Sequence, residues 1–252
     1  MGYKSKSDVK RRVSFPNRDE KLAELIGILT GDGFINEYKN RNSYSLEIAG
    51  NKIKDREYLE RFVFDLIKNS FKIEPSIILR KDQNTMYLVV RSKGIYNFIV
   101  DCGFPSGRKS DIGIPEWIKN NDLFLSKFIR GVFDTDGYIT LKNKEGKKYP
   151  VLGISSKSEI LLNEIGTYLN KLTISYYIGS HINKSREYKN KIVDYKLQVS
   201  GKKNIRLFFE FIGSNNIRNR IKYHEMEVLG VEPRTPRASV VCSPAELYLL
   251  ND

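Results

Sequence analysis

Two segments of the chain carry almost the same pattern, LAELIGILTGDGFI at 22–35 and FIRGVFDTDGYI at 128–139. Each is an apolar run with helical spacing that has a small residue at every fourth position and closes on Asp-Gly. These small residues are Gly27, Gly31, Gly131 and Thr135. Because residues four apart lie on one helix face, two such helices can approach more closely than the usual ~8–10 Å between axes. The repetition predicts an internally duplicated chain whose two helices meet along these faces.

Each of the two predicted helices ends on an acidic residue, Asp32 in the first and Asp136 in the second. Close approach of the helices would place the two carboxylates side by side at the negative ends of two helix dipoles, where they also repel each other. A divalent cation relieves this conflict, since Mg²⁺ typically binds one or two carboxylates together with substrate phosphates. Paired carboxylates around metal also fit in-line attack on a phosphodiester. The residues that follow, Gly33 and Gly137, suit the left-handed conformation that commonly ends a helix.

The two segments resemble the motifs of the LAGLIDADG homing endonucleases in their single-chain, two-repeat form, with the nine-residue motif on 25–33 and 129–137. The resemblance covers about residues 20–228. It implies that Asp32 and Asp136 are the catalytic, metal-binding residues and that they share two or more Mg²⁺ ions. The other members of the implied metal site directly precede them in the chain and are Gly31 and Thr135.

The chain departs from the family pattern at the sixth motif position, where Thr30 replaces the usual Asp while Asp134 keeps it. In the family this position is a helix-end group rather than a metal ligand, so the implied metal site is not affected. The segment GFPSGRKS at 103–110 places the family's active-site lysine on Lys109, which we expect to be the third catalytic residue.

The corresponding segment of the second half, GSNNIRNR at 213–220, puts Asn219 opposite that lysine. The second basic group of the site would then have to come from Arg218 or Arg220. The same match suggests polar groups around the metals at the two strand-to-helix junctions. These are Gly50, Asn51, Ser156 and Lys157, for which the ordinary alternative is a helix N-cap.

The segments after each motif repeat one order of elements, which predicts an α+β fold of two αββαββα repeats. The repeats are expected to be related by pseudo-twofold symmetry, with two antiparallel DNA-binding sheets meeting at a central two-helix interface. The expected divisions are a basic N-terminal tail at 1–19, the first repeat at 20–101, a linker at 102–123, the second repeat at 124–228 and a C-terminal extension at 229–252.

Period-two alternation separates the core face of each predicted strand from a polar outward face. Because a β-ribbon fits the DNA major groove, these outward residues are expected to read base edges, while basic loop residues contact phosphates. The expected DNA-contacting residues are Asn36, Tyr38, Ser43, Ser45, Glu47, Arg80, Tyr87, Arg91, Thr140, Lys142, Lys184, Arg186, Lys189, Lys191, Lys196 and Gln198.

Composition points to a nucleic-acid partner, since 43 Lys and Arg against 30 Asp and Glu give a net charge of +13. Two cysteines and two histidines, widely separated, disfavour a disulfide framework, a zinc cluster or a His-based triad. No apolar stretch approaches the ~20 residues of a membrane span, and the start lacks the apolar core of a signal peptide. We therefore expect an intracellular protein, in the cytoplasm of a prokaryote or in an organelle, that is neither secreted nor membrane-bound.

Together these features predict a divalent-metal-dependent endodeoxyribonuclease that acts as a monomer on double-stranded DNA, without a protein partner, and makes a site-specific double-strand break. The resemblance implies an intron-encoded homing endonuclease. An intein is disfavoured because no splicing Cys or Ser begins the chain and it ends in Leu-Asn-Asp. Two alternatives on the same fold stay open, an RNA-splicing maturase and a DNA-binding protein that has lost cleavage. Both acidic residues are present, which argues against the second alternative but not the first.

Overall fold

The computed structural model describes residues 5–38, 40, 42–81, 83–144, 147–183 and 192–228. The helices are α1 (Lys6–Lys10), α2 (Glu20–Asp32), the π-helix η2 (Tyr58–Val63), α3 (Phe64–Phe71), α4 (Lys93–Asp101), α5 (Glu116–Lys119), α6 (Asp122–Asp136), α7 (Glu159–Lys171), α8 (Lys202–Phe211) and α9 (Ile217–Val228). The strands are β1 (Gly33–Tyr38), β2 (Ser43–Asn51), β3 (Ser76–Leu79), β4 (Thr85–Arg91), β5 (Gly137–Lys144), β6 (Lys147–Ser156), β7 (Tyr176–Asn183) and β8 (Ile192–Ser200).

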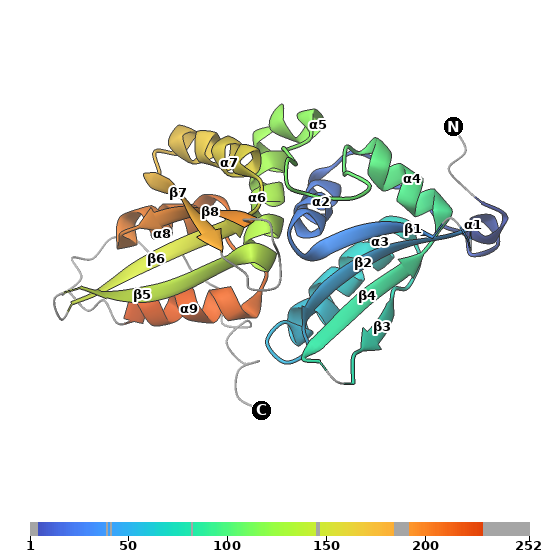
Figure 1. Ribbon diagram of the computed structural model, residues 1–252, viewed down its shortest axis with the longest axis horizontal. Helices are drawn as coiled ribbons and strands as arrows, with labels where there is room; N and C mark the ends of the chain where they lie inside the picture. Colours follow the sequence, from blue (N-terminus) through green and yellow to red (C-terminus); the bar gives the residue numbers. More distant parts are fainter. Residues whose placement is uncertain are drawn as a thin grey trace.

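The strands form two antiparallel sheets with the same topology, β1-β2-β4-β3 and β5-β6-β8-β7. Even the register is repeated, because Gly33 pairs with Ile48 and Gly137 pairs with Ile154. Figure 1 shows the two sheets on either side of the central pair α2 and α6. The predicted α+β fold of two related repeats is therefore confirmed.

Each central helix begins at a side-chain cap and runs directly into a strand. Asp19 caps α2 by accepting a hydrogen bond from the main-chain N–H of Leu22 at 2.8 Å, and the side chain of Asn121 caps α6. The expected left-handed glycines are wrong, since Gly33 and Gly137 have φ of −95° and −90°. An extended residue is needed there because the chain continues from the helix straight into β1 or β5.

The faces of α2 and α6 that carry the small residues pack against each other, as the sequence pattern predicts. An ideal Cβ on Gly27 would lie 2.1 Å from the carbonyl oxygen of Phe128, and one on Gly131 would lie 2.4 Å from that of Glu24. The interface also contains an ion pair, because Arg130 donates to both carboxylate oxygens of Glu24 at 2.8 and 2.6 Å. The two helix backbones are thus in direct contact, with no room for a side chain at either glycine.

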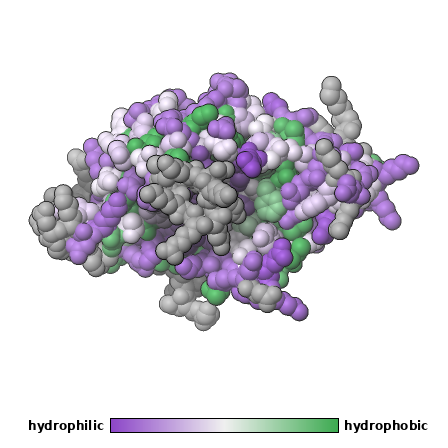
Figure 2. All heavy atoms as spheres, viewed as in Figure 1, coloured by the Kyte–Doolittle hydropathy of each residue, from purple (hydrophilic) through white to green (hydrophobic). Residues whose placement is uncertain are grey.

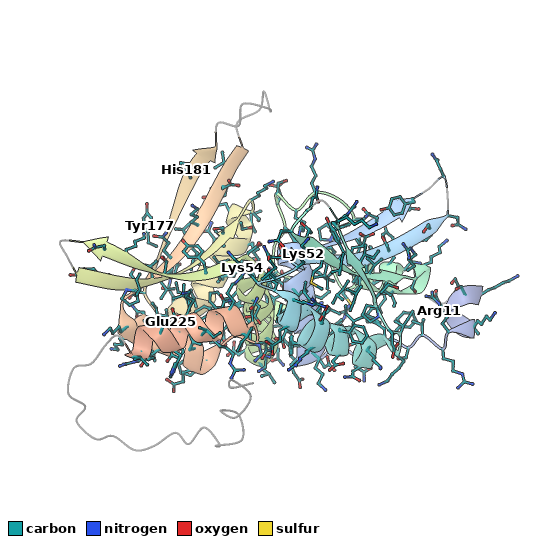
Figure 3. All side chains as sticks on the ribbon, turned by 90° about the horizontal axis from the view of Figure 1, so that it is seen from below. Arg11, Lys52, Lys54, Tyr177, His181 and Glu225 are labelled. Carbon is teal, nitrogen blue, oxygen red and sulfur yellow. The ribbon has the colours of Figure 1, made fainter. Side chains whose placement is uncertain are left out.

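The core lies between the sheets and the helices. Ile35, Leu46 and Val90 stand side by side across the first sheet and are buried, as Ile139, Leu152 and Val199 are across the second. Polar residues alternate with them on the opposite face. In Figure 3 the strands rise on both sides of the central helices, while α3 and α9 lie below. Figure 2 shows hydrophilic atoms over much of the molecular face that it presents.

Two segments are more ordered than the sequence suggests. The expected N-terminal tail contains α1, and its buried Asp8 accepts hydrogen bonds from the hydroxyl of Ser92 at 2.7 Å and the main-chain N–H of Gly94 at 3.0 Å. The second repeat ends with an additional helix, α9, which packs beside β5 (Figure 1). Among the described residues, no helix has the length and apolar character needed to cross a bilayer.

Candidate active site

The C-terminal ends of α2 and α6 bring Asp32 and Asp136 together, and both side chains are partly buried. Gly31 permits this approach, because an ideal Cβ on it would lie 1.9 Å from Oγ1 of Thr135 and 3.3 Å from Oδ2 of Asp136. The hydroxyl of Thr135 donates to the main-chain carbonyl of Gly131 at 3.0 Å. The structure therefore places the two acidic residues side by side at the seam between the repeats.

Lys109 lies at the same helix ends. Its ammonium nitrogen lies within hydrogen-bonding distance of four main-chain carbonyl oxygens at the end of α2, which share its three N–H groups. The distances are 2.5 Å to Gly31, 2.8 Å to Gly33, 3.0 Å to Thr30 and 3.2 Å to Leu29. A cation here offsets the negative end of the helix dipole. Burial lowers the pKa of Lys109, while the charges of Asp136 and Asp32 raise it. The lysine that the sequence singled out is thus held beside both carboxylates.

The second repeat has a neutral residue at the position equivalent to Lys109. The side-chain amide of Asn219 is buried and donates to the main-chain carbonyl of Phe133 at 3.3 Å, as Lys109 does to that of Leu29. Leu29 and Phe133 each lie three residues before the acidic residue of their motif. The equivalence that the sequence suggested between Lys109 and Asn219 therefore holds in space.

Arg218 is the basic residue that the second repeat directs to the site. Its guanidinium forms an ion pair with Asp55 at 2.9 Å, and its charge lowers the pKa of Asp32. The side-chain amide of Asn216 also donates to Asp55, at 3.3 Å. Of the two arginines that the sequence offered, Arg218 is therefore next to the acidic pair, whereas Arg220 is exposed.

The carboxylates lie in an environment that disfavours their charge. Burial raises the pKa of Asp136 to about 7, with the charge of Asp32 acting in the same direction and that of Lys109 against it. The pKa of Asp32 is raised by burial and then by Asp55, while Lys109 and Arg218 lower it. A divalent cation is strongly favoured between two partly desolvated carboxylates, because its charge offsets their mutual repulsion.

The donor atoms present fit a hard divalent cation of the Mg²⁺ type. Both side-chain donors, Asp32 and Asp136, offer carboxylate oxygen, the ligand atom that hard cations prefer. Further ligands would have to be main-chain carbonyls, water or phosphate. The carbonyl of Gly31 already accepts from Lys109, although its second lone pair is available. Metal ligation by Gly31 and Thr135 stays a prediction.

The expected DNA-contacting residues of the strands mostly lie on the outward faces of the sheets. Asn36, Ser45 and Arg91 are neighbours across β1, β2 and β4. In the second sheet Lys142 donates to Oε1 of Gln198 at 3.2 Å, which shows that these two share a face. The other described members are at least partly exposed, and they are Tyr38, Ser43, Glu47, Arg80, Tyr87, Thr140 and Lys196.

Ser45 departs from that expectation. Only 2% of its surface is exposed, and its hydroxyl donates to the carboxylate of Glu47 at 2.7 Å. Ser45 therefore supports the orientation of Glu47 and does not present its own hydroxyl to a ligand. The four loop residues expected to contact phosphates lie outside the described residues, and they are Lys184, Arg186, Lys189 and Lys191.

Sequence reasoning missed Asp55. Its position after β2 is that of an ordinary helix-start residue, and it does accept a hydrogen bond from the main-chain N–H of Asn51 at 3.0 Å. Its partner Arg218 comes from the other end of the fold, so no local pattern signals the ion pair. The same turn bears Lys52 and Lys54, which Figure 3 shows near the boundary between the two halves.

Comparison with protein families gives two matches, one for each repeat. The family described as WhiA LAGLIDADG-like domain matches residues 22–101, and the LAGLIDADG-like domain matches residues 124–213. Both acidic residues and both small-residue faces fall within these ranges.

Three curated relatives are similar to most of this chain but differ in length and in printed function. An uncharacterised protein of Methanocaldococcus jannaschii is 26% identical over 69% of this chain and 62% of its own length. A glutamine–fructose-6-phosphate aminotransferase of the same organism is 29% identical over 80% of this chain but only 17% of its own length. A probable cell division protein WhiA of Lactobacillus gasseri is 29% identical over 81% of this chain and 66% of its own length. The chain thus spans less than two thirds of each relative.

Among solved structures, I-DmoI in complex with DNA and Ca superposes with a TM-score of 0.54 at 22% identity, covering 78% of this chain and 91% of that one. This likeness establishes the fold. The two family matches together cover more than half of the chain, and with the duplicated topology they show that it belongs to the LAGLIDADG family, with two repeats in a single chain.

Proposed function

We propose that this protein is a divalent-metal-dependent endonuclease that cuts both strands of a specific double-stranded DNA site. The observation that carries the proposal is the pairing of Asp32 and Asp136 at two touching helix ends, where burial and mutual repulsion oppose their charge. A protein that only bound DNA would gain stability by replacing either carboxylate with a neutral group. The presence of both carboxylates is explained if a bound cation links them to a phosphodiester.

The two helix ends place two carboxylates at one site. A DNA duplex bound across this site would bring one phosphate of each strand to the acidic pair. A bound Mg²⁺ would supply stabilisation of phosphate charge and make a bound water more acidic. In the hydrolysis, the water oxygen bonds to phosphorus, the bond from phosphorus to a deoxyribose oxygen breaks, and that oxygen takes up a proton. Lys109 and Arg218 lie beside the acidic pair, where they can stabilise the charge that builds up on the phosphate oxygens.

The outward faces of the two sheets are proposed to supply the sequence preference. Arg91 lies on the outward face of the first sheet, and Lys142 and Gln198 share the outward face of the second. A β-ribbon has a shape that fits a major groove. The net charge of +13 adds non-specific attraction to phosphates. With one sheet in each repeat, the chain has two reading surfaces and requires no second subunit, so we propose that it acts as a monomer.

We also propose that the cleavage serves homing of an intron that contains the gene. The match to a small part of an aminotransferase supports mobility of segments of this kind, because it places a related segment within a protein of unrelated activity. The corresponding measurement is whether Mg²⁺ and this protein linearise a plasmid bearing the gene's insertion site without the intervening sequence.

The first experiment is selection of cleaved molecules from a plasmid library with a randomised duplex segment, incubated with protein and Mg²⁺. A recovered site should be linearised by the wild type, whereas Asp32→Asn and Asp136→Asn should cut neither strand but bind within about tenfold, ~1.4 kcal/mol, of the wild type. Asp65→Asn is the matched control, since it removes the same charge from an exposed position on α3. Undiminished cleavage by either of the first two variants would disprove the two-carboxylate assignment.

A second candidate is a DNA-binding regulator without cleavage. The matches to the WhiA LAGLIDADG-like domain and to a probable cell division protein support it in one respect, because the printed role of that relative is cell division rather than cleavage of DNA. The two candidates differ in one outcome of the same experiment. If the protein binds library duplexes that share a sequence but produces no nicked or linear DNA with any divalent cation tested, the result favours the regulator.

A further inference from the structure

One row of side chains crosses the outward face of each sheet close to the acidic pair, and the two rows differ in chemistry. The row of the first sheet begins two residues after Asp32 and contains Phe34, Glu47 and Val89, which pair across β1, β2 and β4. Val89 is apolar and only 4% exposed, so Glu47 is the one of these three whose side chain can form hydrogen bonds with a ligand. The first row therefore presents a carboxylate to the DNA that the sheet is proposed to bind.

The carboxylate of Glu47 is held in one orientation. The hydroxyl of Ser45, a buried residue, donates to its Oε1 at 2.7 Å. Among the described residues Glu47 forms no ion pair. A carboxylate without a cation is unfavourable next to a polyanion unless the DNA itself supplies a hydrogen-bond donor. In the major groove, the donors are the exocyclic amino groups of cytosine and adenine.

Of these two bases, cytosine fits a carboxylate better. Cytosine presents only its N4 amino donor to the major groove, whereas adenine presents the acceptor N7 beside its N6 amino group. An ionised carboxylate accepts hydrogen bonds and donates none, so its second oxygen would be repelled by N7 of adenine. Guanine and thymine present acceptors and no donor on this edge. The side chain of Glu47 is therefore complementary to cytosine and rejects the other three bases.

The equivalent row of the second sheet begins two residues after the second motif Asp and contains Tyr138, Gly153 and Gln198. Gly153 has the position of Glu47, and the ring of Tyr138 lies over it, because an ideal Cβ on Gly153 would be 2.4 Å from Cζ of Tyr138. Tyr177 pairs with Gln198 in the same row and lies on the side of the sheet away from α9 in Figure 3. This row therefore offers an amide from β8, where the first row offers a carboxylate from β2.

Two neighbours fix the orientation of the Gln198 amide. Lys142 donates to its Oε1 at 3.2 Å, and this contact identifies the oxygen side of the amide because an ammonium group can only donate. On the other side, Nε2 donates to the hydroxyl of Tyr138 at 3.2 Å. One lone pair of the oxygen and one N–H are left for DNA. This acceptor beside a donor matches N6 and N7 of adenine, and no other base presents that pair on its major-groove edge.

We propose that Glu47 selects a cytosine in one half of the DNA target and that Gln198 selects an adenine in the other half. Ser45 and Tyr138 are positioning residues, which hold the carboxylate and the amide. The inference rests on the proposed binding of double-stranded DNA by the two sheets. Each row is the next one after the residue pair that begins its sheet beside the acidic pair, so both bases lie in the inner part of the target.

The test selects duplexes from a randomised library by their retention on the full chain in EDTA, so that base preference is measured without cleavage. The wild type should enrich a sequence with a cytosine that Glu47→Gln changes to adenine by about tenfold or more, because the amide adds a donor beside its acceptor. Gln198→Glu should change an adenine in the other half to cytosine. Ser45→Ala and Tyr138→Phe should keep the preferred base but weaken the preference for it by about threefold, each at the position that its partner reads.

Glu37→Gln is the control, because Glu37 lies on the opposite face of the same sheet, where it accepts from the hydroxyl of Tyr44 at 3.1 Å. It removes the same charge and should leave every base preference unchanged. The inference is overturned if Glu47→Gln alters no position, or alters one that is not cytosine in the wild-type sequence. The corresponding result for Gln198→Glu and adenine overturns it equally, as does retention of duplexes that share no sequence. If the predicted bases are selected but the wild type cuts no DNA with Mg²⁺, the endonuclease function is rejected and the inference stands.

Discussion

The contact between α2 and α6 allows a sharp test of the packing argument through Gly131→Ala. An ideal Cβ at Gly131 would lie 2.4 Å from the carbonyl oxygen of Glu24, 2.7 Å from the main-chain nitrogen of Ile28 and 3.0 Å from the carbonyl carbon of Gly27. All three atoms belong to the backbone of a regular helix, so no side-chain rotation can relieve the overlap. The helices would have to separate by roughly 1 Å to restore ordinary contact distances.

That separation has two costs. Overpacking of a well-filled interior typically destabilises by ~1–3 kcal/mol. A gap of up to ~1 Å along the rest of the interface forfeits between about a quarter and a half of each dispersion contact there. We therefore expect a loss of ~3 kcal/mol or more in the free energy of unfolding, which for a chain of this size lowers Tm by roughly 6–12 °C. Gly27→Ala should act in the same way, because its Cβ would meet the carbonyl of Phe128 at 2.1 Å.

Thermal and urea unfolding monitored by circular dichroism provide the measurement. The matched control is Gly179→Ala, whose Cβ would lie 2.9 Å from the ring of Tyr177, a side chain that is 68% exposed and free to turn outward (Figure 3). Its effect should stay within about 0.5 kcal/mol, as is usual for surface positions. If Gly131→Ala unfolds at the wild-type temperature, the helices do not rely on the absence of a side chain, and the reasoning is refuted.

Three further outcomes are expected. Asp8→Ala should destabilise by ~1–3 kcal/mol in urea unfolding, because it leaves the hydroxyl of Ser92 and a main-chain N–H without their buried acceptor. The pKa of Asp136, about 7 in the folded state, lies above its ordinary value of 3.8, so the stability from its bound proton is complete below about pH 4 and is lost as pH rises toward 7. Asp136→Asn should therefore flatten the fall in unfolding free energy over that window, measured without divalent cations. Gln198→Ala should relax base preference at one or two positions by ~1–3 kcal/mol of discrimination, measured by cleavage profiling on randomised targets.

The duplicated architecture was predictable because its signals are local and periodic. Alternation of period two located the strands, and the outward register at Asn36, Lys142 and Gln198 agrees with the sheet pairing. Small residues at every fourth position predicted the helix contact because only backbone approach explains two such stripes. By contrast, α9 was not predicted, since its sequence IRNRIKYHEMEV is polar on nearly every side and follows no clear apolar stripe.

The candidate site was predictable only where one motif carries its own geometry. Asp32 and Asp136 follow from the repeated segments and Lys109 from the family resemblance of residues 103–110, and the structure brings the three together. The pairing of Asp55 with Arg218 joins residues from the two repeats. The family match pointed to Arg218 as a candidate, but Asp55 alone looks like an ordinary helix-start residue. The same holds for Ser45, whose alternation pointed outward although a hydrogen bond to its neighbour in the strand withdraws it from the surface.

The contact that stabilises the fold and the contact that creates the site are one and the same. Gly31 lacks a Cβ, and Thr135 occupies the space that a Cβ would need, which brings a carboxylate oxygen of Asp136 to 3.3 Å from that position. Any change that relaxes the helix interface must therefore also move the acidic pair apart. In a duplicated chain the close packing of α2 and α6 must be kept, but the residues around the acidic pair can differ between the two halves, because each half has its own coding sequence. The difference between Lys109 and Asn219 at equivalent positions is what such freedom produces, and it leaves a symmetric scaffold with an asymmetric distribution of charge.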